Sequence, residues 1–355
     1  MRVVLDAGPL TLPSGGLRRY VAELSRALAE TFPEDEFVLA SDQPVRWPGC
    51  PLSNLLPADP PRGRLERRWW LWGLPRLLKR TGAAVFHGTN FEVPYLPVTA
   101  SVLTLHDLSP WLDRRWHCAA ARVRRRTPWL LGLDLATMII THTDAVRRQA
   151  IEYFRLDPLR VVSVPLAAPA GFRPLETPPP EKPYLLYVGA LEPRKNLVTL
   201  LEAWRHLRRR FSVDLVLAGR RREDFPPLEP EQGLRWLGEV PDEQLPPLYS
   251  GALACVYPSC YEGFGLPVLE AMQCGAAVIA SRDPAISEVA GEAAVLLDPF
   301  DCRAWIEALT AALERPDWTA QWRQRALRRA AQFSWERTAQ LTREVYQEAW
   351  RRYRE

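Results

Sequence analysis

The chain has 355 residues, of which 47% are hydrophobic and 25% charged, a composition typical of a soluble globular protein and a length that favours two domains. Its 46 basic and 42 acidic residues leave a net charge of +4, which is too small to indicate a nucleic-acid-binding surface. The six cysteines form no C-x-x-C pair, and no apolar run approaches the ~20 residues needed to cross a bilayer. We therefore expect reduced thiols and a cytoplasmic protein without a signal peptide.

The first half of the chain alternates buried-type strands with amphipathic helices. Apolar runs predict about six strands, at residues 2–7, 37–41, 85–87, 102–106, 138–143 and 161–164. Helical spacing predicts helices at residues 17–31 and 144–154. Strands and helices in alternation are typical of a parallel sheet covered by helices, so we expect a Rossmann-like α/β domain.

A glycine pair, Gly15 and Gly16, lies between the first predicted strand and the first predicted helix. Free backbone N–H groups at the start of a helix can bind an anion, and glycine lets a ligand approach the backbone closely. The alternative is a plain turn between a strand and a helix.

Residues 64–80 (RLERRWWLWGLPRLLKR) form a basic and aromatic segment that Gly73 and Pro75 interrupt. The spacing predicts an amphipathic helix packed on the sheet. The alternative is a surface that touches a lipid-linked substrate or the inner face of the cell membrane, which would make the protein peripheral to that membrane.

Two histidines, His87 and His106, end predicted strands in the runs FHGTN and LTLHDLSP. Doubly wound sheets bind ligands at the carboxyl ends of their strands, so both residues are candidates for a binding cleft. The alternative for a lone histidine is a structural role. We place His106 in the cleft and leave both interpretations open for His87.

A proline-rich break at residues 165–183 separates the two halves of the chain. After it, strands are predicted at residues 184–188, 213–218, 234–237, 252–256, 277–280 and 293–297. Helices are predicted at residues 196–210, 242–250, 266–274, 302–314 and 334–354, the last with Ser334 as its N-cap. We therefore expect one domain over residues 1–168, a second over 169–333, and a final helix over 334–355.

The run GALEPRKN follows the first strand of the second domain. Arg194 and Lys195 stand immediately before a predicted helix, so two cations and a helix N-terminus point at one place after Gly189. This combination suits a diphosphate, and the alternative is ordinary surface charge. Gly219 and Arg220 follow the next strand, where a structural strand end explains them nearly as well as a ligand does.

The stretch YPSCYEGFGLPVLEAMQCG, residues 257–275, carries the most informative pattern. Two carboxylates, Glu262 and Glu270, lie on a loop and the helix that follows it. Each can accept hydrogen bonds from two adjacent hydroxyl groups, so the pair suits a ligand rich in hydroxyls. The predicted contact residues are Glu262, Gly263, Phe264, Gly265, Leu266 and Glu270. The alternative is that Glu262 caps the helix and Glu270 is solvated.

The spacing Glu262-x7-Glu270 within YEGFGLPVLEAM resembles the E-x7-E signature of retaining glycosyltransferases of family 4. The resemblance covers nearly the whole chain, although its specific motifs lie in the second half. It implies the GT-B fold, an α/β architecture in which two Rossmann-like doubly wound parallel-sheet domains face a central cleft and a C-terminal helix crosses back to the first domain. Two departures, Arg18 in GGLRRY and His142 in THTD, affect the acceptor side.

The resemblance also implies roles for the candidate residues. His106 and Glu262 would contact the donor sugar, and Arg194 and Lys195 would stabilise the departing diphosphate. Glu270 would hold the ribose hydroxyls. The other implied donor-binding residues are Gly15, Gly16, Gly189, Gly219, Arg220, Gly263, Phe264, Gly265 and Leu266. Because the sequence contains no D-x-D motif, neither a metal nor a separate cofactor is expected.

By the same resemblance, the leading prediction is transfer of a hexose from a nucleotide sugar to a glycan or lipid-linked acceptor, with retention of anomeric configuration, in surface polysaccharide synthesis. The runs FHGTN, HDLSP and GALEPRKN favour mannose from GDP-mannose, while UDP-glucose or another hexose donor stays open. The alternatives are a sugar-nucleotide epimerase or phosphorylase of the same fold, and a non-catalytic partner in polysaccharide assembly. Intact Glu262, Glu270, Arg194 and Lys195 argue against the last alternative.

Overall fold

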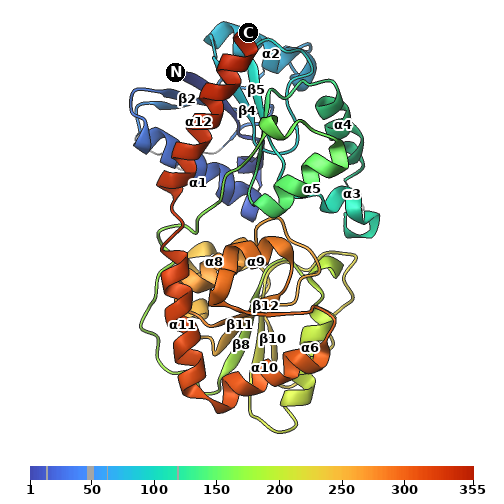
Figure 1. Ribbon diagram of the computed structural model, residues 1–355, viewed down its shortest axis with the longest axis vertical. Helices are drawn as coiled ribbons and strands as arrows, with labels where there is room; N and C mark the ends of the chain where they lie inside the picture. Colours follow the sequence, from blue (N-terminus) through green and yellow to red (C-terminus); the bar gives the residue numbers. More distant parts are fainter. Residues whose placement is uncertain (13–14, 46–51, 62, 118–119) are drawn as a thin grey trace. The chain divides into compact units, whose positions relative to one another are not determined.

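The computed structural model describes residues 1–12, 15–45, 52–61, 63–117 and 120–355. The chain divides into two compact units, one formed by Met1–Leu166 with Ser334–Glu355 and the other by Ala167–Phe333. Each unit contains one sheet with helices packed around it (Figure 1). Two of the six cysteines, Cys50 and Cys118, lie outside the described residues.

The first unit contains a seven-stranded parallel sheet in the order β3-β2-β1-β4-β5-β6-β7. Its strands are β1 (Arg2–Asp6), β2 (Glu36–Ala40), β3 (Leu55–Pro57), β4 (Val85–Gly88), β5 (Ala100–Thr104), β6 (Met138–Thr141) and β7 (Val161–Ser163). The prediction of about six strands missed β3, because three residues ending in a proline are too short to show a periodic pattern.

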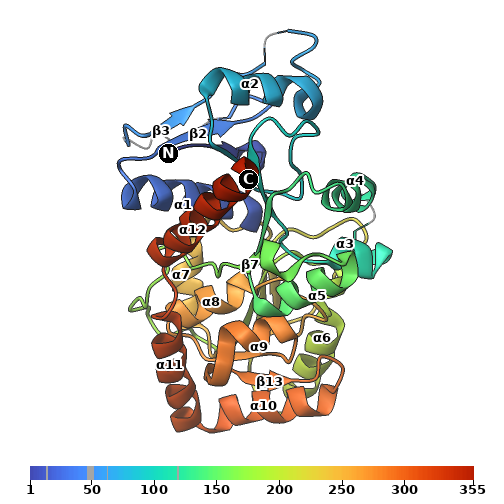
Figure 2. The same cartoon turned by 45° about the horizontal axis from the view of Figure 1, so that its top comes forward.

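The helices of the first unit come from both ends of the chain. They are α1 (Gly16–Thr31), α2 (Leu74–Thr81), α3 (Ser109–Leu112), α4 (Ala121–Gly132), α5 (Asp144–Phe154) and α12 (Trp335–Arg354). The last helix packs along α1 and against strands β4, β5 and β6 (Figure 2). Its predicted N-cap is confirmed, because the Ser334 hydroxyl accepts a hydrogen bond of 3.1 Å from the backbone N–H of Arg337.

The predicted helix over residues 64–80 is partly wrong. Turns occupy residues 63–68, a π-helix covers Trp69–Gly73, and α2 begins only at Leu74. Gly73 allows this geometry, because a Cβ at that position would lie 2.1 Å from the carbonyl oxygen of Glu66. Pro75 lacks the N–H that would bond four residues back, so a regular helix cannot run through this point.

The second unit contains a six-stranded parallel sheet in the order β10-β9-β8-β11-β12-β13. Its strands are β8 (Tyr184–Val188), β9 (Asp214–Ala218), β10 (Leu234–Trp236), β11 (Ala254–Tyr257), β12 (Val278–Ser281) and β13 (Val295–Leu297). Its helices are α6 (Leu197–Leu207), α7 (Leu245–Gly251), α8 (Leu266–Gln273), α9 (Pro284–Ala290), α10 (Cys302–Glu314) and α11 (Pro316–Ala330). The predicted fold of two parallel-sheet α/β domains is confirmed, whereas α9 and α11 were not predicted.

In both sheets the order of the strands reverses at one place. In each, the chain builds strands outward in one direction and then returns to the other side of the first strand, beyond β1 in the first unit and beyond β8 in the second. The loops that follow strands on either side of such a switch point diverge and leave room for a ligand. Within the described part of the chain, no helix is long and apolar enough to cross a membrane.

Candidate functional site

Two loops of the second unit meet at its topological switch point. β8 pairs with β9 on one side and with β11 on the other, so the loops that follow β8 and β11 start side by side at the carboxyl edge. The first loop carries GALEPRKN and the second carries CYEGFG. The backbone N–H of Cys260 donates to the carbonyl oxygen of Arg194 at 2.8 Å, which ties the two loops together.

Glu262 is the point where both predicted cations converge. Its Oε1 accepts a hydrogen bond of 2.5 Å from Lys195 Nζ, and its Oε2 accepts one of 3.1 Å from Arg194 Nη1. Only 12% of the Glu262 side chain is exposed. The two cations lie in a short 3-10 turn, and α6 begins two residues after Lys195, at Leu197. The structure therefore brings together three residues that the sequence analysis placed in two separate motifs.

The electrostatic environment keeps Glu262 ionised. Burial by itself would raise the pKa of the Glu262 carboxyl group, but the charges of Lys195 and Arg194 outweigh burial and lower this pKa to about 2. Asp283 lies next to this loop, and its Oδ2 accepts from the backbone N–H of Glu262 at 3.3 Å. Burial, with a contribution from the Glu262 charge, raises the pKa of Asp283 to about 6.

Arg194 is held mainly by the protein itself. Its Nη1 also donates to the carbonyl oxygen of Tyr261 at 2.6 Å, and its Nη2 donates to Glu192 Oε1 at 2.8 Å. Glu192 Oε2 in turn accepts from Arg222 Nη1 at 2.6 Å. The sequence motifs by themselves indicate no role for Glu192 or Arg222. The only feature of the sequence that could have indicated the pair of Glu192 with Arg194 is that Glu192 stands two residues before Arg194. At that spacing a 3-10 turn can bring the two side chains together.

The glycines Gly189 and Gly219 meet where β8 and β9 end. A Cβ on Gly219, which has φ +146°, would lie 2.0 Å from the carbonyl oxygen of Gly189. The close approach of two backbone turns therefore requires Gly219, whatever ligand binds nearby. Arg220, the next residue, is exposed at the same edge of the sheet.

Glu270 lies within α8 and is 1% exposed. Its Oε2 accepts a hydrogen bond of 3.0 Å from the Tyr249 hydroxyl. The N-cap of α8 is Gly265, in the left-handed conformation with φ +83°, while Glu262 pairs with the two cations. The interpretation of a helix-capping Glu262 and a solvated Glu270 is therefore wrong.

The four residues after Glu262 lead from the loop into α8. The Phe264 ring is buried and meets the ring of Phe333 edge-on at 6.1 Å, so this side chain packs in the core of the unit. Gly263 and Gly265 flank it, and Leu266 is the first residue of α8.

In the first unit, Gly15 and Gly16 lie at the start of α1, with Gly15 as the N-cap at φ +106°. A Cβ added to either glycine would meet no described atom within 4 Å. The positive φ angle explains why position 15 favours a glycine. Packing among the described residues does not explain why position 16 is also a glycine.

His106 lies two residues beyond the end of β5, where the sequence analysis expected the last residue of the strand. Both of its ring nitrogens have protein partners: Nε2 lies 2.8 Å from the carbonyl oxygen of Thr89, and Nδ1 lies 3.0 Å from His142 Nε2. Burial lowers the pKa of His106, so the ring is kept neutral. In the sequence, His142 is visible only as a departure from the family pattern at THTD.

His87 has a structural role. It is fully buried, with Nε2 2.7 Å from Thr104 Oγ1 and Nδ1 2.7 Å from the Tyr346 hydroxyl on α12. Burial lowers the pKa of His87 to about 3.

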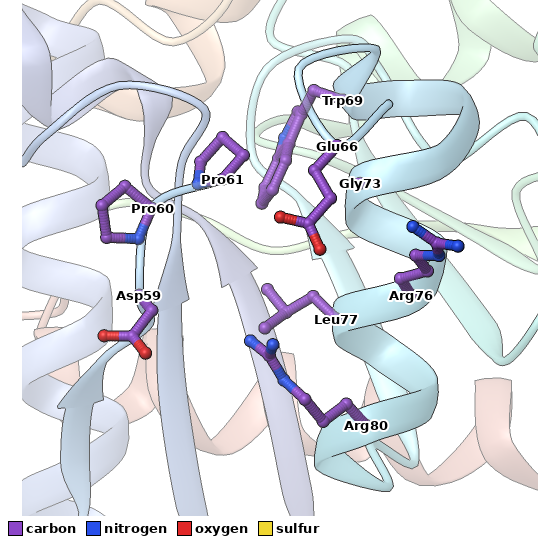
Figure 3. Close-up of a pocket in the computed structure, with 9 residues that line it drawn as sticks. All are labelled: Asp59, Pro60, Pro61, Glu66, Trp69, Gly73, Arg76, Leu77 and Arg80. Atoms are coloured by element: carbon purple, nitrogen blue, oxygen red, sulfur yellow. The ribbon is translucent and has the colours of Figure 1, made fainter. Parts of the chain in front are cut away.

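A separate cavity of about 200 Å³ lies between the loop after β3 and the segment that leads into α2. Figure 3 shows the Glu66 carboxylate and the Arg80 guanidinium directed toward the space beside Asp59 and Pro60. The lining residues are Asp59, Pro60, Pro61, Glu66, Trp69, Gly73, Arg76, Leu77 and Arg80. This cavity contains none of the predicted site residues. Among the residues that the structure describes, no group of three or more His, Cys, Asp or Glu is arranged to hold a metal ion.

Two family models match successive parts of the chain. The model described as Glycosyltransferase Family 4 matches residues 14–170, and the model described as Glycosyl transferases group 1 matches residues 172–329. A protein from Escherichia coli named O-antigen chain mannosyltransferase B is 33% identical, over 98% of this chain and 99% of its own length.

Two further similarities extend this result. Serotype-specific mannosyltransferase WbdA from Escherichia coli is 28% identical over 68% of this chain, which corresponds to 32% of that longer protein. The solved structure of sucrose-phosphate synthase from Thermosynechococcus elongatus matches with a TM-score of 0.75 at 20% identity, and covers 98% of both chains. At that identity the structural match bears on the fold alone, and it confirms the expected GT-B class.

Proposed function

Because the chain belongs to glycosyltransferase family 4, we propose that it transfers a mannosyl group from GDP-mannose to a glycan or lipid-linked acceptor, with retention of anomeric configuration. The observation that carries this proposal is the 33% identity, along almost the whole chain, with a protein named O-antigen chain mannosyltransferase B. The name of that relative also supports the proposal that this protein acts in surface polysaccharide synthesis.

The donor is assigned to the second unit and the acceptor to the first. Lys195 offers an ammonium group to the diphosphate at the switch point, and Arg194 lies behind it with most of its donors held by Glu192, Tyr261 and Glu262. Lys195 is therefore the main contact with the phosphates, and Arg194 acts chiefly by fixing the loop on which Glu262 lies. The sequence-based expectation gave both cations a role at the diphosphate, and the proposal here divides that role between them.

The pairing of Lys195 with Glu262 gives donor binding a specific consequence. A diphosphate competes with Glu262 for the same ammonium group, so its arrival frees one carboxylate oxygen to accept from sugar hydroxyls. Glu270 is assigned to the ribose hydroxyls, with the Tyr249 hydroxyl fixing the orientation of its carboxylate.

Charge on the leaving diphosphate increases in the transition state, so a cation held beside it lowers the barrier. Many sugar-nucleotide enzymes supply that charge with a divalent metal on a D-x-D motif, which this sequence does not contain. We assign the task to Lys195, supported by Arg194 and by the backbone dipoles of the loop.

The test is a panel of donors with the purified protein. GDP-mannose, UDP-glucose and ADP-glucose are compared for thermal stabilisation and for release of the nucleoside diphosphate, with and without EDTA. We expect GDP-mannose to give the largest effects and EDTA to leave them unchanged, and we expect NMR of the product to show an α-linkage. Turnover of UDP-glucose in preference to GDP-mannose would refute the donor assignment, and a β-linked product would refute retention.

A further inference from the structure

A row of hydrogen bonds in the first unit holds two imidazole rings between two backbone carbonyl groups. His106 Nε2 lies 2.8 Å from the Thr89 carbonyl oxygen, and His106 Nδ1 lies 3.0 Å from His142 Nε2. His142 Nδ1 lies 3.2 Å from the Val164 carbonyl oxygen. These four residues follow β4, β5, β6 and β7, so the row crosses the carboxyl edge of the sheet over four adjacent strands.

The number of protons that this row requires exceeds the number that neutral rings supply. Carbonyl oxygens only accept hydrogen bonds, so a row of three bonds between two carbonyl groups needs three N–H protons. Two neutral imidazoles carry two. Burial lowers the pKa of His106, and it lowers the pKa of His142 well below its ordinary value, so a third proton is not retained at neutral pH. One position in the row must therefore lack its proton.

The lengths of the three contacts favour one position. All three lie within the ordinary range of a hydrogen bond, at 2.8 Å to Thr89, 3.0 Å between the rings and 3.2 Å to Val164, so loss of a proton costs least at the longest contact, the one with Val164. If the proton were missing between the rings, His106 Nδ1 and His142 Nε2 would face each other with two lone pairs across 3.0 Å. The arrangement that keeps the two shorter bonds has Nε2–H on His142 and Nε2–H on His106.

The surrounding side chains restrict the orientation of both rings. The Tyr20 ring on α1 lies edge-on to His106 at 5.3 Å and to His142 at 5.1 Å. The Tyr20 hydroxyl is itself fixed, 3.0 Å from Thr104 Oγ1. The Phe91 ring meets His106 from another side at 5.4 Å. A 180° flip of the His142 ring would put carbon atoms where its two nitrogens now lie, so the contacts with His106 and Val164 keep Nε2 directed at His106.

We infer that His142 is a positioning residue, which donates its Nε2–H to Nδ1 of His106 and so fixes both the orientation of His106 and its Nε2–H tautomer. In this structure that N–H is bonded to the Thr89 carbonyl oxygen, so a ligand oxygen would have to share this donor or replace Thr89 as its acceptor. The identification of that ligand as the donor sugar rests on the proposed function, whereas the hydrogen bond between the two rings does not.

NMR of protein labelled with 15N-histidine tests the bond itself, because the chain has only five histidines. Deletion of one histidine at a time assigns the spectrum. We expect His106 to be neutral with its proton on Nε2 in the unsubstituted protein, and to become a mixture of tautomers in His142→Ala. His142→Gln should restore the single tautomer, because its side-chain amide can donate to the same nitrogen. A proton on Nδ1 of His106, or a tautomer that His142→Ala leaves unchanged, would overturn the inference.

Kinetics with the donor that the panel identifies then test the consequence. We expect kcat/KM to fall about tenfold in His142→Ala, the loss that one orienting hydrogen bond supplies, and to return to within about threefold in His142→Gln. His206→Ala, an exposed histidine on α6, is the matched control and should leave kcat/KM unchanged. Equal losses in the Ala and Gln variants would contradict a positioning role. If no sugar nucleotide is turned over, the proposed function fails while the NMR result still decides the histidine pair.

Discussion

Replacing Glu262 by glutamine should destabilise the protein by an amount that depends on pH. The substitution keeps the size of the side chain and removes the charge that Lys195 and Arg194 share. The pKa of Glu262 falls from its ordinary 4.5 to about 2 in the folded protein, and at 1.36 kcal/mol per unit this shift corresponds to about 3 kcal/mol. Loss of one partner from a buried ion pair costs a similar amount, about 3–5 kcal/mol.

The pH dependence follows from the sign of the shift. Because the folded pKa is lowered, the unfolded chain binds more protons between pH 4.5 and about 2. The stabilising contribution of Glu262 is therefore complete above pH 4.5 and is lost as the pH falls toward 2. We expect the difference between the unsubstituted protein and Glu262→Gln to be about 3 kcal/mol at pH 7 and roughly 1.5 kcal/mol at pH 3.

Urea unfolding followed by circular dichroism measures this difference, because urea is uncharged and does not screen ion pairs. The matched control is Glu307→Gln, which removes a carboxylate from the exposed pair of Arg303 and Glu307 on α10 and should change stability by less than about 0.5 kcal/mol. The reasoning is refuted if Glu262→Gln is as stable as Glu307→Gln at pH 7, or if its deficit at pH 3 equals that at pH 7.

Three further outcomes are expected. Lys195→Ala should lower kcat for sugar transfer by about 10²-fold or more, measured as release of the nucleoside diphosphate, because it removes the cation beside the leaving group; a variant with ordinary turnover would place the diphosphate elsewhere. Glu270→Ala should raise KM for the donor and change kcat little, since a ribose contact exists equally in the ground and transition states, and a fall in kcat alone would reverse that role. Gly219→Ala should lower stability by about 3 kcal/mol or more in urea unfolding, because its Cβ would overlap the carbonyl oxygen of Gly189, whereas Gly171→Ala, which meets no described atom within 4 Å, should change stability little.

Local patterns in the chain were enough to predict most of the secondary structure and the class of fold. The apolar run at Tyr184–Val188 and the periodic segment at Cys302–Glu314 are a strand and a helix with the predicted bounds. Both depend on residues close together in sequence, so a periodicity of two or of 3.6 is sufficient to identify them. The same reasoning failed for β3, which is too short, and for residues 64–80, where the π-helix depends on the contact between Gly73 and Glu66.

The partners of the site residues depended on tertiary structure. Arg194 and Glu262 are 68 residues apart in the chain, and they meet because β11 pairs with β8, a neighbour relation that periodicity does not encode. His106 and His142 meet in the same way, because β5 and β6 are adjacent and their loops end at one edge of the sheet. Residue types could therefore indicate a site for a diphosphate and for hydroxyls. Which cation faces a ligand, which one fixes a loop, and which tautomer a histidine adopts depend on the order of strands, because that order sets which loops approach each other in the fold.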